Sequence, residues 1–258
     1  MNVQTELKGP LARITLNNPD KRNAFDNTII EALINAFALA NADDGTRVIV
    51  LQAAGKHFSA GADLGWMRKM GELGYQENLD DALRLGELMR VIDQSTKPVI
   101  AKVHGASFGG ALGLICAADI AVCDEAARFC LSEVKLGILP AVIAPYVVRA
   151  MGERQARRYF MSGEIFNAAD AHRLGVVHEV ASAEQLEAHV GEFIEALLAG
   201  APQAQIEARE LVARTGHDNV DQPMIDYTAA LIARLRTQQE GQEGLSAFLE
   251  KRAPAWRS

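Results

Sequence analysis

The fold is decided by the stretch between residues 99 and 122, which begins Val99-Ile-Ala-Lys-Val103 and continues His104-Gly-Ala-Ser-Phe-Gly-Gly110. The first five residues predict a buried strand, because apolar and β-branched side chains dominate them. Gly105 to Ala117 predicts a turn that leads into a helix, and Ile120-Ala-Val122 predicts the next strand. A strand, a helix and a second strand in this order indicate a βαβ unit of a mostly parallel sheet.

The segments before this stretch follow the same alternation. Leu11–Leu16 and Val48–Leu51 predict strands, and between them Asp26 is placed to cap a helix with apolar residues at helical spacing. A further helix is expected over Asn78–Gln94. We therefore expect an α/β core.

Beyond Ala141 helices dominate, apart from an expected strand at Val176–Val180. Ser182–Gln185 has the spacing of a capping box that opens one helix, and Pro202 suits the first turn of the next. We expect a core over residues 1–200 and a helical C-terminal region over residues 201–258. That region must bury its apolar faces on the core or on another subunit.

Composition excludes several classes of function. The chain has 258 residues, of which 49% are hydrophobic, so a folded globular protein is expected. It carries 26 basic and 33 acidic residues, a net charge of −7, which argues against nucleic acid as a partner. No segment is long and apolar enough to span a membrane, and the N-terminus lacks a signal-peptide pattern.

Three cysteines, Cys116, Cys123 and Cys130, lie seven residues apart without a CxxC motif. An odd number in this pattern fits neither a disulfide framework nor a zinc site. We expect reduced core thiols, no bound metal and a cytoplasmic location.

Gly105-Ala-Ser107-Phe-Gly109 matches the G-x-S-x-G pattern of a serine-hydrolase nucleophile elbow. Its histidine would come from His172, His178 or His217, which follow in the required order. The alternative is a tight turn in which Ser107 has no chemical role. Serine hydrolysis is kept as a hypothesis of a second functional class.

The glycines of the same stretch favour another chemistry. Gly109-Gly110 precedes a helix, and helix N-termini present free N–H groups to developing negative charge. A second small-residue turn, Ser59-Ala-Gly-Ala-Asp63, follows the strand Val48–Leu51. Two such turns at one end of a sheet would each offer an N–H to polarise a carbonyl oxygen. Ordinary tight connections are an equally good interpretation of the pattern alone.

Glu133 lies among apolar neighbours, where loss of hydration would raise the pKa of its carboxyl into the range that suits a general acid or base. The alternative is a glutamate paired with Lys135 or turned to water. Asp119, next to Ala118 and Ile120, is expected to be a buried structural carboxylate.

The chain resembles the enoyl-CoA hydratase/isomerase (crotonase) family along almost its whole length. The resemblance rests on five segments in order: Asn17–Ala24, His57–Leu64, His104–Gly110 with Ala118-Asp119, Phe129–Pro140, and Phe248–Pro254. It implies a crotonase fold (ClpP/crotonase-like), a spiral of ββα units with a helical C-terminal region that forms homotrimers or, by pairing trimers, homohexamers.

The resemblance also implies roles for individual residues. The N–H groups of Ala62 and Gly110 would form the oxyanion hole, and Glu133 would be the catalytic acid/base. Coenzyme A enters as part of the acyl-CoA substrate, with no permanently bound cofactor. Its expected contacts are Arg22, Ala60, Ala62, Asp63 and Leu64, with Phe248 and Lys251 from a neighbouring subunit. The basic pairs Lys21-Arg22 and Lys251-Arg252 are the local positive charge that this polyanion needs.

Two longer segments, Ser59–Met67 and Ser132–Tyr146, resemble a narrower branch, the bacterial hydratases of branched glutaconyl-CoA thioesters. Their substrates are 3-methylglutaconyl-CoA in leucine and isovalerate catabolism and isohexenylglutaconyl-CoA in acyclic terpene catabolism. The sequence departs from the two-glutamate hydratases at Gly113, where they carry a second carboxylate, so Δ3,Δ2-enoyl-CoA isomerisation is the alternative. The bulky Ala141-Val-Ile-Ala144 is expected to reshape the acyl pocket, and Lys135 and Arg149 are candidates to bind a distal carboxylate.

Overall fold

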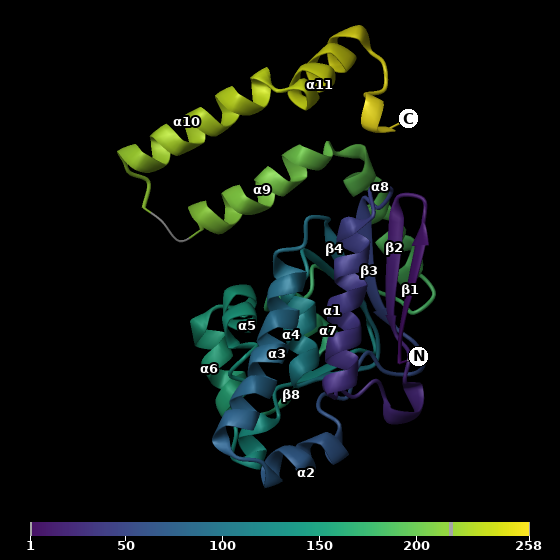
Figure 1. Ribbon diagram of the computed structural model, residues 1–258, viewed down its shortest axis with the longest axis vertical. Helices are drawn as coiled ribbons and strands as arrows, with labels where there is room; N and C mark the ends of the chain where they lie inside the picture. Colours follow the sequence, from purple (N-terminus) through teal and green to yellow (C-terminus); the bar gives the residue numbers. More distant parts are fainter. Residues whose placement is uncertain (1, 217–218, 258) are drawn as a thin grey trace.

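A six-stranded sheet runs through the body of the protein (Figure 1). The computed structural model describes residues 2–216 and 219–257. The strands, in sheet order, are β1 (Val3–Lys8), β2 (Leu11–Leu16), β3 (Val48–Ala53), β4 (Val99–Val103), β6 (Ile120–Asp124) and β9 (Glu179–Ala181). β1 and β2 form an antiparallel hairpin, and all other neighbours pair in parallel. The expected mostly parallel sheet is confirmed, although the strand expected at Val176–Val180 is reduced to β9.

A second sheet of three short strands lies beside the first. It has the order β5 (Ala106–Phe108), β7 (Arg128–Cys130) and β8 (Ile165–Asn167). The rings of Phe129 and Phe166 stack across it at 5.4 Å, and Tyr159 packs on Phe166 at 4.6 Å. Residues 105–109 were expected to form only a turn, so the sequence interpretation missed β5.

The helices cover both faces of the main sheet and then extend beyond it (Figure 1). They are α1 (Asn27–Ala42), α2 (Leu64–Glu72), α3 (Tyr75–Asp93), α4 (Gly110–Ala117), α5 (Ala144–Met151), α6 (Glu153–Ser162), α7 (Ala168–Arg173), α8 (Leu186–Ala199), α9 (Pro202–Thr215), α10 (Gln222–Thr237) and α11 (Gln239–Glu250). Three short 3-10 segments are η1 (Pro19–Lys21), η2 (Glu133–Leu136) and η3 (Ala255–Arg257).

Two of the three expected helix starts are confirmed. Asp26 caps α1 by accepting a hydrogen bond from the N–H of Ile29 at 2.9 Å, and Pro202 lies in the first turn of α9. The capping box at Ser182 is wrong, because Ser182–Gln185 forms a turn and α8 begins at Leu186 without a side-chain cap.

The apolar run Val48–Leu51 at the start of β3 follows from the central place of this strand. Ile49 and Leu51 point into the large core on the side of α1, α3 and α4, whereas Val48 and Val50 pack with α8 on the other face. A parallel strand covered on both faces needs apolar residues at every position. This architecture fixes the ends of β3 and β4, and the turns that follow them, in a rigid frame.

The C-terminal helices leave this frame. Figure 1 shows α10 and α11 at the top of the molecule, at the opposite end from α2. α9 is tied to the core by Arg209, which binds both carboxylate oxygens of Asp119 at 2.6 and 2.7 Å. Asp119 also accepts from the N–H of Val99 at 2.7 Å. The expectation that Asp119 is buried is therefore wrong, since its side chain is 30% exposed, but its structural role holds.

Candidate active site

The two small-residue turns lie side by side. Ser59 and Ser107 form a parallel bridge, in which Ser59 N–H donates to Ala106 O at 3.1 Å and Phe108 N–H donates to Ser59 O at 3.0 Å. Gly61 follows at once, with φ +89°, and a Cβ on it would lie 2.9 Å from Phe108 O. Only glycine allows this backbone conformation and this approach. Of the two interpretations of these turns, the structure supports the one in which they lie together.

Each turn carries a backbone N–H that points to no internal acceptor. On either side of Ala62, Gly61 O accepts from Phe25 N–H and Asp63 N–H donates to Phe25 O, both at 2.7 Å. The N–H of Ala62 itself and that of Gly110, the first residue of α4, make no hydrogen bond within residues 2–216 and 219–257. A helix start adds a partial positive charge at Gly110. Both N–H groups are therefore free to donate to an acceptor from outside the chain.

Glu133 lies against this pair of turns. A Cβ placed on Gly109 would lie 2.9 Å from Glu133 Oε1, so the carboxylate occupies the space left by the missing side chain. Glu133 Oε2 is buried and has no hydrogen-bond partner, and burial raises the pKa of this carboxyl above its ordinary value. The alternative pairing with Lys135 is not found in the described part of the chain. A desolvated carboxylate beside two free N–H groups suits proton transfer.

The space beside Gly113, one turn further along α4, is filled. A Cβ there would lie 2.8 Å from both Ile143 Cβ and Met89 Sδ, and closer still to Ile143 Cγ2. Ile143 and Met89 are both buried. Packed apolar side chains therefore fill the position at which the resemblance to two-glutamate hydratases leads one to expect a second carboxylate.

The segment before α1 is held to the turn at residue 60 by its backbone. Ala60 N–H donates to Arg22 O at 2.9 Å, and Arg22 and Asn23 both adopt left-handed conformations. Asn23 is buried; its Nδ2 donates to Ala54 O and His57 O at 2.9 and 2.8 Å, and its Oδ1 accepts from Asn18 N–H at 2.8 Å. The sequence interpretation gave Asn23 no role, although asparagine's tolerance of left-handed backbone was a usable signal.

One of the two basic residues in this segment, Lys21, already forms an ion pair within the chain. Lys21 Nζ pairs with Asp63 Oδ2 at 3.1 Å, and Asp63 caps α2 by accepting from the N–H groups of Gly65 and Trp66. These bonds hold the pKa of Asp63 below its ordinary value. Arg22 forms no ion pair with any described residue, so it is the free cation of its basic pair.

Two expected contacts of coenzyme A are not brought to Glu133 within one chain. Phe248 is 81% exposed on α11, and Lys251 follows that helix, at the other end of the molecule from α2 (Figure 1). Arg252 is bound to Glu243 and Glu250. Leu64, by contrast, opens α2 next to Asp63 and is 79% exposed.

The serine-hydrolase hypothesis is wrong. Ser107 is fully buried within β5, and its hydroxyl has no hydrogen-bond partner. His178 Nδ1 accepts from Ala121 N–H, and no described histidine is hydrogen-bonded to Ser107 Oγ; His217 lies outside the described residues. A nucleophile needs both access and a base.

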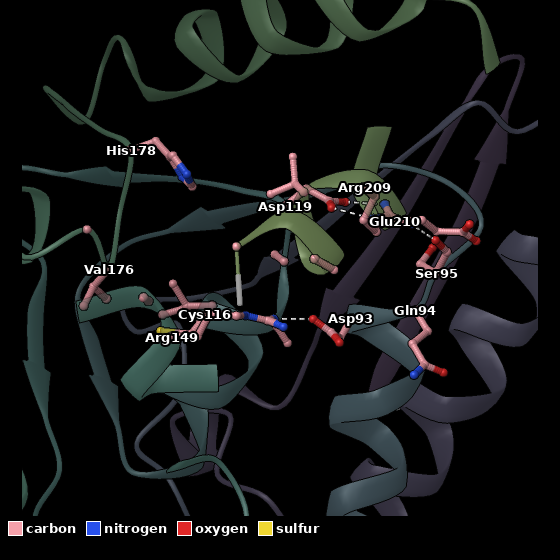
Figure 2. A pocket seen from close by; sticks show the side chains of 18 of the residues that line it. Asp93, Gln94, Ser95, Cys116, Asp119, Arg149, Val176, His178, Arg209 and Glu210 are labelled. Atoms are coloured by element: carbon pink, nitrogen blue, oxygen red, sulfur yellow. Dashed lines mark hydrogen bonds and ion pairs between the residues drawn. The ribbon is translucent and has the colours of Figure 1, made fainter. Parts of the chain in front are cut away.

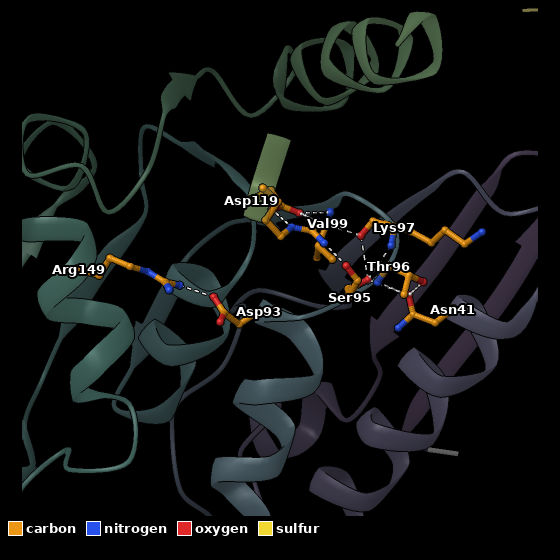
Figure 3. Close-up of polar contacts among 9 residues, drawn as sticks. Asn41, Asp93, Ser95, Thr96, Lys97, Val99, Asp119 and Arg149 are labelled. Atoms are coloured by element: carbon orange, nitrogen blue, oxygen red, sulfur yellow. Dashed lines mark hydrogen bonds and ion pairs between the residues drawn. The ribbon is translucent and has the colours of Figure 1, made fainter. Parts of the chain in front are cut away.

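A cavity of about 940 Å³ lies at the other end of α4, between the core and α9 (Figure 2). Arg149 lines it and forms an ion pair with Asp93, as Figures 2 and 3 show. Arg149 is therefore engaged, and it lies at the far end of α4 from Gly110, which excludes it from the space around Glu133. Lys135 is exposed and lies in η2 with Glu133, so it remains a candidate to bind a distal carboxylate.

Comparison with known proteins identifies the fold around these turns. Residues 6–258 match the family described as enoyl-CoA hydratase/isomerase. The chain belongs to this family. Its α/β architecture is the crotonase fold of that family. In the described ranges, no helix combines the length and hydropathy that a membrane crossing requires.

Other members of the enoyl-CoA hydratase/isomerase family carry different activities in their names. An enoyl-CoA hydratase from Shewanella pealeana is 46% identical, with a TM-score of 0.97, over 99% of this chain and 96% of that one. The 2,3-dehydroadipyl-CoA hydratase of Escherichia coli is 30% identical over 93% of this chain and 92% of its own. A trans-2-decenoyl-[acyl-carrier-protein] isomerase of Streptococcus mutans is 29% identical over 95% and 93%. The relatives of this chain thus include hydratases and an isomerase.

Proposed function

We propose that this protein adds water across the α,β double bond of an enoyl-CoA thioester. The observation that carries the proposal is the place of Glu133, whose desolvated carboxylate lies against Gly109, directly before the free N–H of Gly110. The relatives named as enoyl-CoA hydratases support the same reaction.

The chemistry follows from this arrangement. The N–H groups of Ala62 and Gly110 bind the thioester oxygen and stabilise negative charge on it. Glu133 removes a proton from water as the water oxygen bonds to Cβ, and the C=C electron pair moves to form the enolate. Glu133 then returns the proton to Cα. Both new bonds form on one face, because one carboxylate serves both steps.

We propose that the nucleotide end of coenzyme A lies along Ala60 to Leu64. Ala60 and Asp63 border this path through their backbones, Leu64 offers an exposed apolar side chain, and Arg22 offers an unpaired positive charge. Phe248 and Lys251 would complete the site from a neighbouring subunit of a homotrimer or homohexamer. Their exposure on α11, with that of Leu245 and Leu249, supports this role.

For the acyl group we propose a branched glutaconyl-type chain, 3-methylglutaconyl or isohexenylglutaconyl, as in leucine/isovalerate or acyclic terpene catabolism. The motif resemblance supports this choice. Lys135, exposed and in the same η2 segment as Glu133, is the remaining candidate for the distal carboxylate.

Double-bond isomerisation is the second candidate, because Gly113 supplies no second carboxylate and Ile143 leaves no room for one. One assay separates the two. The purified protein is given a panel of 2-enoyl-CoA thioesters, and loss of enoyl absorbance is followed; a 3-enoyl-CoA is given separately. We expect hydration of at least one branched thioester. A protein that shifts the 3-enoyl double bond but hydrates nothing is an isomerase.

A further inference from the structure

The chain turns back at the end of α11 and returns to the core. Lys251 ends the helix in a left-handed conformation, with φ +56°, and Arg252 N–H donates to Ala247 O at 3.0 Å. A left-handed residue at this place ends a helix and turns the chain out of it. Residues 252–257, here called the C-terminal strap, run from α11 towards the end of α8, as Figure 1 shows.

The C-terminal strap is bound to α11 by hydrogen bonds to one carboxylate. Arg252 donates from Nη1 and Nη2 to the two carboxylate oxygens of Glu243, at 2.6 and 2.8 Å. Glu243 Oε1 also accepts from Ala255 N–H at 2.9 Å. Because Glu243 lies inside α11, these bonds join the strap to the helix at two points.

Trp256 attaches the strap to the core. Its indole Nε1 donates to Ala199 O, at the end of α8, at 3.1 Å. Its ring also lies close to α11, because a Cβ placed on Gly244 would lie 3.0 Å from Trp256 Cη2. The indole is therefore placed between α8 and α11.

Arg47 holds the same junction from the main sheet. Its guanidinium donates to Trp256 O at 3.2 Å and to Gly200 O at 2.8 Å, and its backbone N–H donates to Pro10 O at 2.8 Å. Arg47 directly precedes β3, so these bonds tie the strap to a rigid strand. A cavity of about 590 Å³ lies beside the junction, lined by Arg47, Ala199 and Trp256 among others. The junction therefore depends on a few directed bonds more than on close packing.

α11 has a second attachment, at its start. There Glu240 accepts from the N–H groups of Gln203 and Ala204 in α9, both at 3.0 Å. Of the residues of α11, all of which lie in the described part of the chain, only Ala247 is buried. Without Trp256 the helix would still be attached through Glu240 and α10, but its far end would be free to move.

That far end carries Phe248 and Lys251, the residues proposed above to contact coenzyme A in a neighbouring subunit. Lys251 stands five residues before Trp256 in the sequence. We propose that Trp256, bonded to Ala199 and Arg47, positions Lys251 for the nucleotide end of coenzyme A. Trp256 acts through Lys251 and is a positioning residue, not a contact of the ligand. The inference rests on the proposed function, from which it takes the coenzyme A contacts.

The test measures dissociation constants of coenzyme A and of phosphopantetheine, which lacks the nucleotide, for the parent and for Trp256→Ala. We expect the constant for coenzyme A to rise about tenfold, which corresponds to the loss of one hydrogen bond to a charged group. The constant for phosphopantetheine should stay the same. Arg257→Ala, which trims the next, exposed side chain of the strap, is the matched control and should change neither constant. Unchanged coenzyme A binding in Trp256→Ala, or an equal rise in both constants, overturns the proposal.

Trp256→Phe provides a graded variant. Its ring keeps the contact with Gly244 but has no N–H for Ala199 O, so we expect coenzyme A binding between that of the parent and that of Trp256→Ala. A phenylalanine variant that binds coenzyme A more weakly than the alanine variant contradicts the role given to the ring.

A double variant shows whether Trp256 acts through Lys251. In a Lys251→Ala background, Trp256→Ala should raise the dissociation constant of coenzyme A much less than in the parent, because two changes to one contact are not additive. Equal increases in the two backgrounds overturn the proposal. The sedimentation mass of Trp256→Ala should equal that of the parent; a lower mass would show that Trp256 holds subunits together and would overturn its positioning role.

Kinetics then separate this inference from the proposed function. In the hydration assay, Trp256→Ala should raise KM for the enoyl-CoA thioester and leave kcat unchanged, since Glu133 and the free N–H groups are untouched. If the parent hydrates nothing, the proposed function fails, while the dissociation constants still decide the role of Trp256: the selective rise for coenzyme A supports it and the absence of that rise overturns it.

Discussion

The carboxylate of Glu133 occupies the place where a side chain of Gly109 would stand, with Oε1 2.9 Å from the position of that missing Cβ. Gly109 has φ +54° and ψ −124°, a conformation that side chains other than hydrogen strongly disfavour. The backbone of one turn thus creates both the free N–H of Gly110 and the space for the acid that works beside it.

Gly109→Ala should damage both stability and activity. The new methyl group would strain a left-handed backbone, at about 1–3 kcal/mol, and would displace the Glu133 carboxylate. We expect a lower Tm and a loss of hydration that exceeds the fraction unfolded. Gly191→Ala is the matched control, since this glycine of α8 has open space around its Cβ position and should be neutral or stabilising. Full activity in a folded Gly109→Ala protein would refute the contact.

The raised pKa of Glu133 predicts how stability depends on pH. The folded state binds its proton more tightly than the unfolded state, whose pKa is near 4.5. Stability due to this group is therefore greatest at low pH and is lost as pH rises through the raised pKa. Glu133→Gln lacks the charge, so its Tm relative to the parent should increase with pH and then level off. Thermal unfolding from about pH 4 to pH 8 checks this. A difference that falls with rising pH contradicts a raised pKa.

We expect the hydrogen bonds of Asn23 to hold the segment that carries Arg22 in its conformation. Asn23→Ala leaves Ala54 O, His57 O and Asn18 N–H without their partner. These groups are partly buried, so losing the partner costs up to about 1–3 kcal/mol, the cost of a buried unsatisfied group, and alanine also tolerates the left-handed backbone less well. We expect a marked fall in the free energy of unfolding by urea and weaker coenzyme A binding. Asn35→Ala, on the exposed face of α1, should change neither.

Arg209 should decide whether α9 stays on the core. It joins Asp119 through two hydrogen bonds and also donates to Ser95 O and to Lys97 O. Figure 3 shows Asp119, Ser95 and Lys97 around Val99, where β4 begins. We expect Arg209→Ala to lower stability by about 1.5–3 kcal/mol, the range for hydrogen bonds to charged groups. Arg209→Lys should rescue it only partly, because lysine has no planar fork. Arg154→Ala, at an exposed position of α6, is the control. If Arg209→Ala, Arg209→Lys and Arg154→Ala were equally stable, Arg209 would not hold α9 on the core.

The sequence predicted the elements that carry a strong periodic signal. β3 and β4 were found because burial on both faces makes most of their residues apolar, β2 because its buried residues alternate with partly exposed ones, and α1 because Asp26 and the helical spacing agree. β5, β7 and β8 were missed as strands, since three residues are too few to show an alternation. The predicted cap at Ser182 is wrong because the turn after it continues to Gln185, and the Ser-x-x-Gln pattern alone does not show where the helix begins.

In the candidate site, too, local features could be predicted from the sequence and contacts between distant segments could not. The two glycine turns and the raised pKa of Glu133 were predicted, because local sequence determines backbone freedom and apolar surroundings. The filling of the space at Gly113 by Ile143 was beyond reach, since that contact joins α4 to the residue before α5. The burial of Asp119 was mispredicted because its apolar sequence neighbours face inward while its own side chain turns to Arg209.

The central claim is that Glu133 transfers the proton. It is tested most directly by kcat/KM for hydration of a branched 2-enoyl-CoA by Glu133→Gln, the parent, and Glu125→Gln, in which an exposed glutamate is changed. The account predicts a loss of about 100-fold or more for Glu133→Gln alone, with acyl-CoA binding retained, and a parent rate that falls on the acid side at a pH above 4.5. A folded Glu133→Gln protein that hydrates the thioester at near-parent rate would contradict it.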